Sequence, residues 1–199
     1  MKKPLILKAG DTIGFVACAR KIKREELDPA IQLFKSWGLN IAFGNYLFNE
    51  QNQFSGSDEQ RAEDFQSMLN NPEIKAIISA RGGYGTMRMV DLVDWTDFEK
   101  NPKWICGFSD ITVLHSHIHS NCGVVTLHSP MPSTILNSSE EALLSFRKAL
   151  FGEELHYQFS ANTDNIKLNR NGKCSAPIIG GNLSLLYALN GSTSDTDMD

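Results

Sequence analysis

The feature that most constrains the fold is a repeated alternation of short apolar segments with amphipathic ones. The apolar segments are rich in Ile, Val and Ala and have the length of buried parallel strands. The amphipathic segments carry apolar residues at helical spacing, and one of them begins with a capping box formed by Ser57 and Gln60. A strand–helix–strand order favours right-handed crossovers, so we predict an α/β fold with a parallel sheet covered by helices on both faces. The expected strands are 11–17, 39–43, 74–80, 104–106 and 123–128, and the expected helices are 23–37, 57–70, 86–93, 111–119, 140–150 and 183–189.

A tight turn, Gly107-Phe108-Ser109-Asp110, separates the fourth expected strand from the helix that follows it. A serine between a strand end and a helix start is where an α/β enzyme places a nucleophile, with the first helical N–H groups directed at the group that it attacks. Ser followed by Asp at a helix start is also an ordinary N-cap. The local sequence leaves both interpretations open and by itself favours the cap.

A second loop, Arg81-Gly82-Gly83-Tyr84-Gly85, follows the third expected strand. Its glycines permit positive φ and let backbone N–H groups converge on an anion, although a plain tight turn explains them equally well. The loop is neither G-x-G-x-x-G nor a P-loop, so dinucleotide and nucleotide-triphosphate sites are not indicated. Arg81 could pair with a substrate carboxylate or with a surface acid. Because both loops follow parallel strands, we expect a ligand site at the carboxyl edge of the sheet.

The histidines do not complete a catalytic or metal site. His115 and His119 share a helical face, but no third ligand stands at a suitable spacing, so we expect no metal and no cofactor. His128 ends the fifth expected strand and could line the site, although a histidine at a strand end is more often a packing residue. A nucleophilic serine needs a base, and the base needs an orienting group. Residues 1–175 contain no convincing pair of that kind.

Composition argues against several other classes of protein. The net charge of −4 and the lack of a Lys/Arg stripe argue against a nucleic-acid partner. No apolar run approaches about 18 residues, so no membrane span is expected. Lys8, Gly10 and Asp11 interrupt the start of the chain too early for a signal peptide. The four cysteines are widely spaced, unlike those of a zinc site or a disulfide framework, and we expect a cytoplasmic protein.

Several segments occur in the order found in a known family. They are GDTIGFVA, FSGSDEQRAEDFQ, IKAIISARGGYGTMR, ICGFSDITVLHSHI, GVVTLHSPM and APIIGGNLSLLYALNGS. Together they closely resemble the LD-carboxypeptidase family, which includes murein tetrapeptide carboxypeptidases and microcin-immunity peptidases. The resemblance covers essentially the whole chain, and the pairing of R-G-G-Y-G with G-F-S-D is quite specific.

The resemblance implies a serine peptidase with a Ser-His-Glu triad that releases a terminal D-amino acid from a murein tetrapeptide, as in peptidoglycan recycling. Ser109 would be the nucleophile, and the backbone N–H groups of Asp110 and of Gly83, chosen over Gly82, would form the oxyanion hole. The implied fold is a flavodoxin-like or class I amidotransferase-like N-terminal domain followed by a smaller β-rich domain. From the two loops and the strand end, we expect the substrate pocket to include Arg81, Gly82, Tyr84 and His128.

The family's catalytic Glu and His segments would follow residue 199, and neither motif occurs in this sequence. We therefore expect a truncated form with little activity of its own. Residues 1–155 are expected to form the nucleophile-bearing domain, 156–175 an interdomain connection, and 176–199 the start of an incomplete second domain without a partner to pack against. Such a segment could dimerise, and a homodimer that acts on a small peptide is expected. A non-catalytic binding module and a microcin-type aminoacyl-nucleotide substrate are the alternatives.

Overall fold

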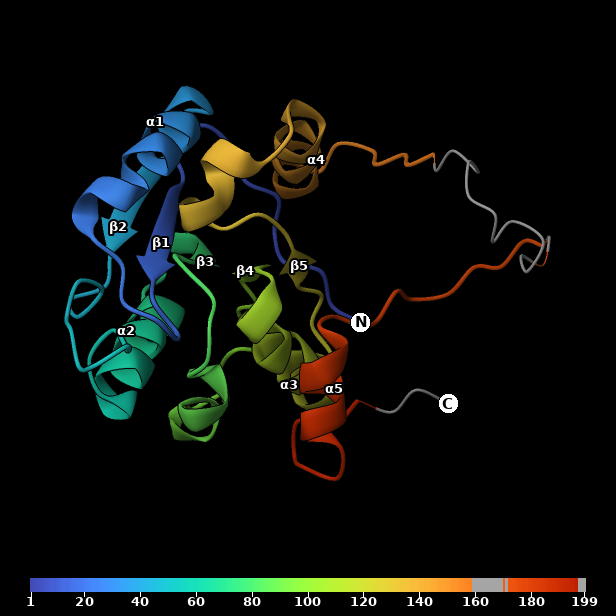
Figure 1. Ribbon diagram of the computed structural model, residues 1–199. Coiled ribbons are helices and arrows are strands. Elements are labelled where there is room, and N and C mark those ends of the chain that lie inside the picture. Colours follow the sequence, from blue (N-terminus) through green and yellow to red (C-terminus); the bar gives the residue numbers. More distant parts are fainter. Residues whose placement is uncertain (159–169, 171, 197–199) are drawn as a thin grey trace.

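The computed structural model describes residues 1–158, 170 and 172–196 (Figure 1). Within these residues the centre is a five-stranded sheet in the order β2-β1-β3-β4-β5, with each neighbouring pair parallel. The predicted α/β fold is therefore confirmed. The strands are β1 (Thr12–Val16), β2 (Asn40–Phe43), β3 (Ile74–Ser79), β4 (Trp104–Gly107) and β5 (Leu127–His128), and the α-helices are α1 (Asp28–Ser36), α2 (Asp58–Asn70), α3 (Thr112–Cys122), α4 (Glu140–Phe151) and α5 (Leu183–Leu189).

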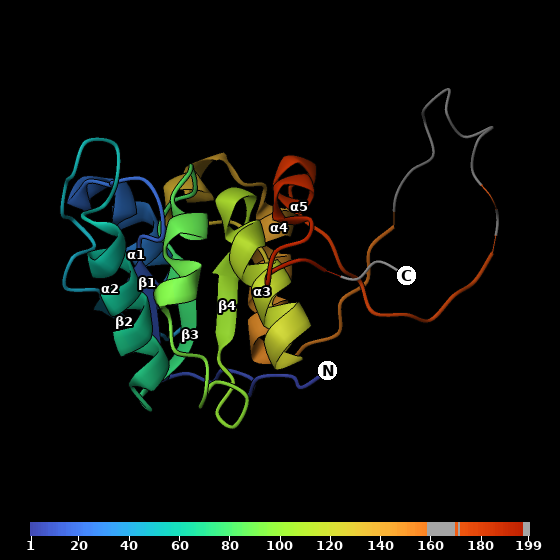
Figure 2. The same ribbon diagram turned by 90° about the horizontal axis from the view of Figure 1, so that it is seen from below.

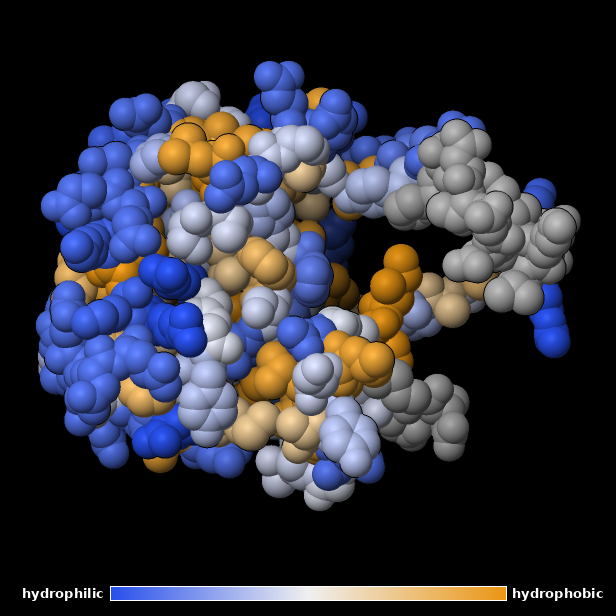
Figure 3. All heavy atoms as spheres, in the orientation of Figure 1, coloured by the Kyte–Doolittle hydropathy of each residue, from blue (hydrophilic) through white to orange (hydrophobic). Residues whose placement is uncertain are grey.

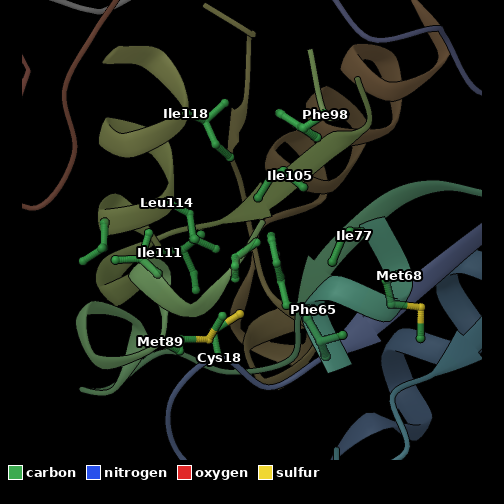
Figure 4. Packing of buried hydrophobic residues seen from close by; sticks show 14 of the residues in the cluster. Cys18, Phe65, Met68, Ile77, Met89, Phe98, Ile105, Ile111, Leu114 and Ile118 are labelled. Atoms are coloured by element: carbon green, nitrogen blue, oxygen red, sulfur yellow. The ribbon is translucent and has the colours of Figure 1, made fainter. Parts of the chain in front are cut away.

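Helices cover both faces of the sheet (Figures 1 and 2). The helices α1 and α4 lie on one face with the 3-10 turn η5 (Pro132–Asn137), and α2 and α3 lie on the other. Successive strand residues enter different cores: Ile77 and Ile105 face α2 and α3 (Figure 4). The next residues along these strands, Ile78 and Cys106, face α1 and α4. Burial on both faces explains why the strands are continuously apolar in sequence.

The helix predicted for 86–93 is wrong. The structure has two 3-10 turns there, η2 (Thr86–Arg88) and η3 (Val90–Leu92). The amide and hydroxyl of Thr86 both donate to the carboxylate of Asp110, at 2.9 and 2.7 Å, which fixes the start of the segment from outside. A segment this short does not recover the cost of nucleating an α-helix, so its buried apolar residues pack from tighter turns.

The strand predicted for 123–128 is shorter than expected. Gly123 ends α3 in the left-handed conformation, with φ +61°, so the chain must turn before it can enter the sheet. Val124 makes an isolated parallel bridge with Lys2, and regular pairing with β4 begins only at Leu127. The edge of the sheet is therefore formed by two residues.

The segment 181–196 packs on α3, which corrects the expectation that the end of the chain has no partner (Figure 2). Leu189 is 3% exposed and belongs to the core beneath α3. The expected interdomain connection, 156–175, lies largely outside the described residues, and the domain boundaries remain predictions. Four hydrogen bonds hold the segment 181–196 on α3 and on the start of that helix. The amide of Asn182 donates to Oγ1 of Thr112 (2.9 Å), and a bond joins Nδ1 of His117 to Oγ of Ser194 (2.9 Å). Nδ2 of Asn121 donates to the carbonyl oxygen of Thr193, and Oγ of Ser120 donates to that of Asp195, each at 2.7 Å.

We expect Leu189→Ala to release this segment locally. Removing a buried leucine side chain should cost about 2–4 kcal/mol, and hydrogen exchange of the amides in 183–189 should accelerate by at least about thirtyfold. The control is Leu144→Ala in α4, since Leu144 is 51% exposed and should leave exchange in α5 unchanged. Equal exchange rates in the two variants would contradict the docking.

Asp64 should make the stability pH-dependent. Its buried carboxylate accepts from the amide of Tyr46 at 3.0 and 3.1 Å, and burial raises its pKa from 3.8 to about 6. The folded state therefore holds this proton more tightly than the unfolded state, and stability falls as pH rises from 3.8 through about 6. Asp64→Asn should raise the free energy of unfolding at pH 7 by about 1–3 kcal/mol and flatten the slope in that window.

Chemical denaturation across the same pH range measures this effect. Glu63→Gln, at an exposed neighbouring position, is the control and should change stability by less than about 0.5 kcal/mol. A destabilised Asp64→Asn protein at pH 7 would contradict the prediction.

Among the described residues, no helix combines the length and the apolar character that a bilayer crossing requires.

Candidate active site

Ser109 lies in a turn with an unusual backbone at the carboxyl end of β4. Its φ is +58°, and Asn52 is the one other non-glycine residue with positive φ in the described part of the chain. Gly107, two residues earlier, has φ +153°, and a Cβ atom there would lie 2.8 Å from the side chain of Ile111. Holding a serine at positive φ costs about 1–3 kcal/mol of conformational free energy. Residues strained in this way cluster at functional sites, and a strained serine between a strand and a helix is typical of nucleophile turns.

The N-cap interpretation of Ser109 is wrong. The 3-10 turn η4 (Ser109–Ile111) begins at Ser109 itself, and the residue at its N-cap is Phe108. The N-cap of α3 is Ile111, and neither cap has a side-chain hydrogen bond. The hydroxyl of Ser109 is thus not used to complete the helix.

The glycine loop of 81–85 lies directly against this turn. A Cβ atom added to Gly82 would lie 3.3 Å from Cβ and 3.6 Å from Oγ of Ser109. A side chain at 82 would therefore crowd Cβ of Ser109 and lie in contact with its hydroxyl. Gly83 follows with φ +131°, a conformation that L-residues rarely adopt. Gly82 faces Ser109, and Gly83 is the next residue along the chain. The place of the Gly83 amide is therefore compatible with the predicted oxyanion hole.

The carboxylate of Asp110 ties the two loops together. Oδ2 accepts from both the amide and the hydroxyl of Thr86, the residue that follows the glycine loop. Oδ1 is buried without a partner among the described residues. Burial raises the pKa of Asp110, against the hydrogen bonds from Thr86. Since the side chain faces inward, the amide of Asp110 remains the group that the family resemblance assigns to the oxyanion hole.

The buried guanidinium of Arg61 contacts the backbone of the glycine loop. Arg61 is 2% exposed and donates to the carbonyl oxygens of Cys18, at 3.2 Å, and Gly56, at 2.9 Å. It also pairs with Asp58 and reaches the carbonyl oxygen of Gly85 at 3.5 Å. One side chain therefore joins α2, the loop after β1 and the glycine loop.

Two predicted pocket residues lie at the surface of this edge. Arg81 is half-buried, and its guanidinium pairs with Glu26 at 3.3 Å, so the surface-acid alternative describes it in this structure. Tyr84 is 48% exposed, with its ring 6.3 Å from that of Phe54. The pocket roles of both residues remain predictions.

His128 lies on the other side of the Ser109 turn. Its exposed ring is 6.1 Å from the rings of Phe108 and His115. An open hollow of about 450 Å³ adjoins it, lined by Phe108, His128, Ser129, Pro130, Thr134, Asn137 and Ser138. The predicted pocket role of His128 fits its place at the edge of this hollow, beside the Ser109 turn, and remains a prediction.

Within the described residues, no hydrogen bond joins Oγ of Ser109 to a base. His115 is buried, its Nε2 donates to the carbonyl oxygen of Gly107 at 2.9 Å, and burial lowers its pKa to about 4. It is therefore a neutral packing residue at physiological pH. His117 is bound to Ser194 on the far part of the same helix. No cluster of three or more potential metal-ligating side chains occurs in this part of the chain either.

Comparison with known proteins identifies the family. A family model described as the LD-carboxypeptidase N-terminal domain matches residues 13–129, which contain both loops. The chain belongs to the LD-carboxypeptidase family.

Two curated relatives and one solved structure show the range of LD-carboxypeptidase proteins that this chain resembles. It is 35% identical to the probable murein peptide carboxypeptidase of Bacillus subtilis, over 98% of this chain and 61% of that protein. It is 25% identical to the Microcin C7 self-immunity protein MccF of Escherichia coli, over 94% of this chain and 63% of the relative. The crystal structure of muramoyltetrapeptide carboxypeptidase from Oxalobacter formigenes superposes with a TM-score of 0.78 at 25% identity, covering 94% of this chain and 62% of that one. The chain thus spans less than two thirds of the length of these relatives.

Two residues that hold the candidate site together, Thr86 and Arg61, are not indicated by the sequence pattern. A threonine after a glycine loop carries no signal of its own. Arg61 follows a capping box in a charged helix start, where an arginine is expected to face solvent. Its burial depends on carbonyl groups from distant loops.

Proposed function

We propose that the protein is a serine LD-carboxypeptidase that hydrolyses the L,D-peptide bond of a murein tetrapeptide and releases the terminal D-amino acid, as in peptidoglycan recycling. The observation that carries the proposal is the positive φ of Ser109 at the carboxyl edge of the sheet, with Gly82 against its hydroxyl. The family and the name of the Bacillus subtilis relative support the reaction class.

In the proposed reaction, Oγ of Ser109 attacks the carbonyl carbon of the L-residue and its proton passes to a base. The N–H groups of Gly83 and Asp110 donate to the oxyanion that forms. The intermediate then breaks its C–N bond, and the D-amino acid leaves as its amine takes up the proton. Water hydrolyses the ester and restores the serine. The base is the Glu-oriented histidine that the family resemblance implies outside residues 1–199, so the chain alone should retain little activity.

The test is release of D-alanine from murein tetrapeptide by the gene product that carries this chain. Release is expected, with a peptide that ends in L-alanine cleaved far more slowly. The 199-residue chain is expected to release less than about a thousandth as much. No release by the gene product, or equal cleavage of both peptides, would reject the proposal. Cleavage of an aminoacyl-nucleotide peptide in preference to murein peptide would favour the microcin-type alternative, in line with the name of the Escherichia coli relative as a Microcin C7 self-immunity protein.

A binding module without catalysis is the second candidate, because no hydrogen bond joins Ser109 to a base within the described residues. It predicts that the gene product binds murein tetrapeptide and that binding survives Ser109→Ala without any turnover. Titration followed by tryptophan fluorescence and the release assay on the same samples separate the two candidates.

We further propose a cytoplasmic homodimer. Cys18, Cys106 and Cys122 are buried free thiols, which fits a reducing compartment. Apolar side chains gather over α5 and the segment before it (Figure 3), where Ile178 is fully exposed and Tyr187 is 83% exposed. Covering such a patch with a second copy would bury it. Sedimentation velocity of the 199-residue chain should give twice the mass of the monomer. A measured mass equal to that of the monomer at micromolar concentration would reject the dimer.

A further inference from the structure

Arg20 lies in the loop after β1, beside the glycine loop, and its backbone is fixed on both sides. It forms an antiparallel bridge with Phe54. The flanking hydrogen bonds run from Ser55 N to Ala19 O and from Lys21 N to Gln53 O, each 3.1 Å. Since β1 neighbours β3 in the sheet, this short ladder holds Arg20 at the same carboxyl edge as the glycine loop and Ser109.

The side chain of Arg20 runs across Gly83. A Cβ atom added to this glycine would lie 2.6 Å from Cγ, 2.8 Å from Cδ and 3.1 Å from Nε of Arg20. The aliphatic stem therefore occupies the space that any other residue at 83 would fill. The residue itself is exposed, so its stem is packed while its guanidinium can meet solvent.

The charge of Arg20 is available for a ligand. Within the described part of the chain, no carboxylate lies within 4 Å of it in an ion pair, in contrast to the other arginines in or beside the glycine loop. Those pairs are Arg81 with Glu26, Arg88 with Asp58, and Arg61 with Asp58. The guanidinium of Arg81 is already paired with Glu26. The guanidinium of Arg20 is also permanently charged but has no such pair, so it can bind an anionic group of a ligand at this edge of the sheet.

We propose that the guanidinium of Arg20 binds the terminal carboxylate of the substrate and so makes the site select free C-termini. In a peptide cut at its last bond, the terminal carboxylate lies one residue, about 3.3–3.6 Å, beyond the scissile carbonyl. The predicted oxyanion donor is the amide of Gly83, and the stem of Arg20 contacts that same residue. The inference rests on the proposed function and adds to it the group that recognises the substrate's end.

The experiment compares two substrates on the gene product that carries this chain: murein tetrapeptide ending in D-alanine, and the same peptide ending in D-alaninamide. The unmodified protein should prefer the free acid. Arg20→Met, which keeps the stem and removes the charge, should lower kcat/KM for the free acid by about ten- to a hundredfold, mainly through KM. Its kcat/KM for the amide should stay within about twofold, so the preference disappears. Arg20→Lys should retain part of it.

Three controls make each outcome decisive. Arg24→Met removes an exposed arginine paired with Asp28, and should keep the preference. A preference that survives Arg20→Met, or an equal loss on both peptides, overturns the inference while leaving the proposed function intact. Loss of the preference in Arg81→Met instead would assign the carboxylate to Arg81 and also overturn it. An unmodified protein that releases no D-alanine, or that cleaves acid and amide equally, rejects the proposed function and the inference together.

Discussion

Replacing Arg61 by methionine is expected to lower the free energy of unfolding by about 3–5 kcal/mol. The guanidinium is buried and donates to the carbonyl oxygens of Cys18 and Gly56, which lie on different loops. Methionine fills part of the volume but leaves these buried acceptors without this donor, each at a cost of about 1–3 kcal/mol. Asp58 keeps a partner, because Arg88 also binds its carboxylate, so the loss reflects the carbonyl groups more than a stranded charge.

Urea denaturation of Arg61→Met and of Arg24→Met measures this effect. Arg24 also makes an ion pair, with Asp28 four residues further along the chain, but that pair is exposed and should contribute less than about 1 kcal/mol. Equal destabilisation by the two substitutions would show that burial of Arg61 has no energetic consequence. The Arg61 variant should also lose activity, because the same side chain supports the loop that carries Gly83.

Replacing Ser109 by alanine should reduce D-alanine release by the gene product at least about a thousandfold. Alanine has the same backbone restrictions as serine, so the turn and the stability should change little. Replacing Ser109 by glycine should abolish release equally but raise stability by about 1 kcal/mol, because glycine adopts φ +58° without the clash of a Cβ atom. Function and stability would then oppose one another at this position.

Asn52→Gly is the matched control, since Asn52 has nearly the same φ, +56°, in a loop distant in sequence. It should gain less stability than Ser109→Gly, because asparagine tolerates the left-handed region, and it should keep full activity. Thermal melting and the release assay give both quantities. A Ser109→Ala protein that still releases D-alanine would remove Ser109 from the mechanism.

Local pattern predicted the parts of this molecule that depend on neighbours in sequence. The strands β1 to β4, α1, α2 and the capping box of Ser57 follow from apolar spacing and polar groups within four residues. The position of Ser109 was also visible, because a serine after a strand and before a helix occupies a defined place. The sequence did not show that the hydroxyl of Ser109 makes no helix-capping hydrogen bond, since this depends on the backbone angle of a single residue.

Contacts between distant residues could not be predicted in this way. Arg61 reaches a carbonyl group 43 residues earlier, and His117 meets Ser194 across 77 residues. The 3-10 turns of 86–92 follow from a carboxylate 24 residues further along the chain. In each case the deciding partner is supplied by tertiary packing, and a window of ten or fifteen residues does not contain it.

The strand order has a consequence for the speed at which the molecule becomes competent. The loops that carry Arg20, Gly83 and Ser109 follow β1, β3 and β4, which lie side by side in the sheet. Along the chain, α1, β2 and α2 separate β1 from β3, and η2 and η3 separate β3 from β4. Each parallel pairing closes a long stretch of chain before its contacts are gained, so folding should be slow for a domain of this size. The carboxyl edge of the sheet cannot form one loop at a time, because the three loops are held next to one another only after β1, β3 and β4 have paired. Ligand affinity should therefore appear in refolding at the rate of sheet formation, after the helical circular dichroism signal has begun to recover.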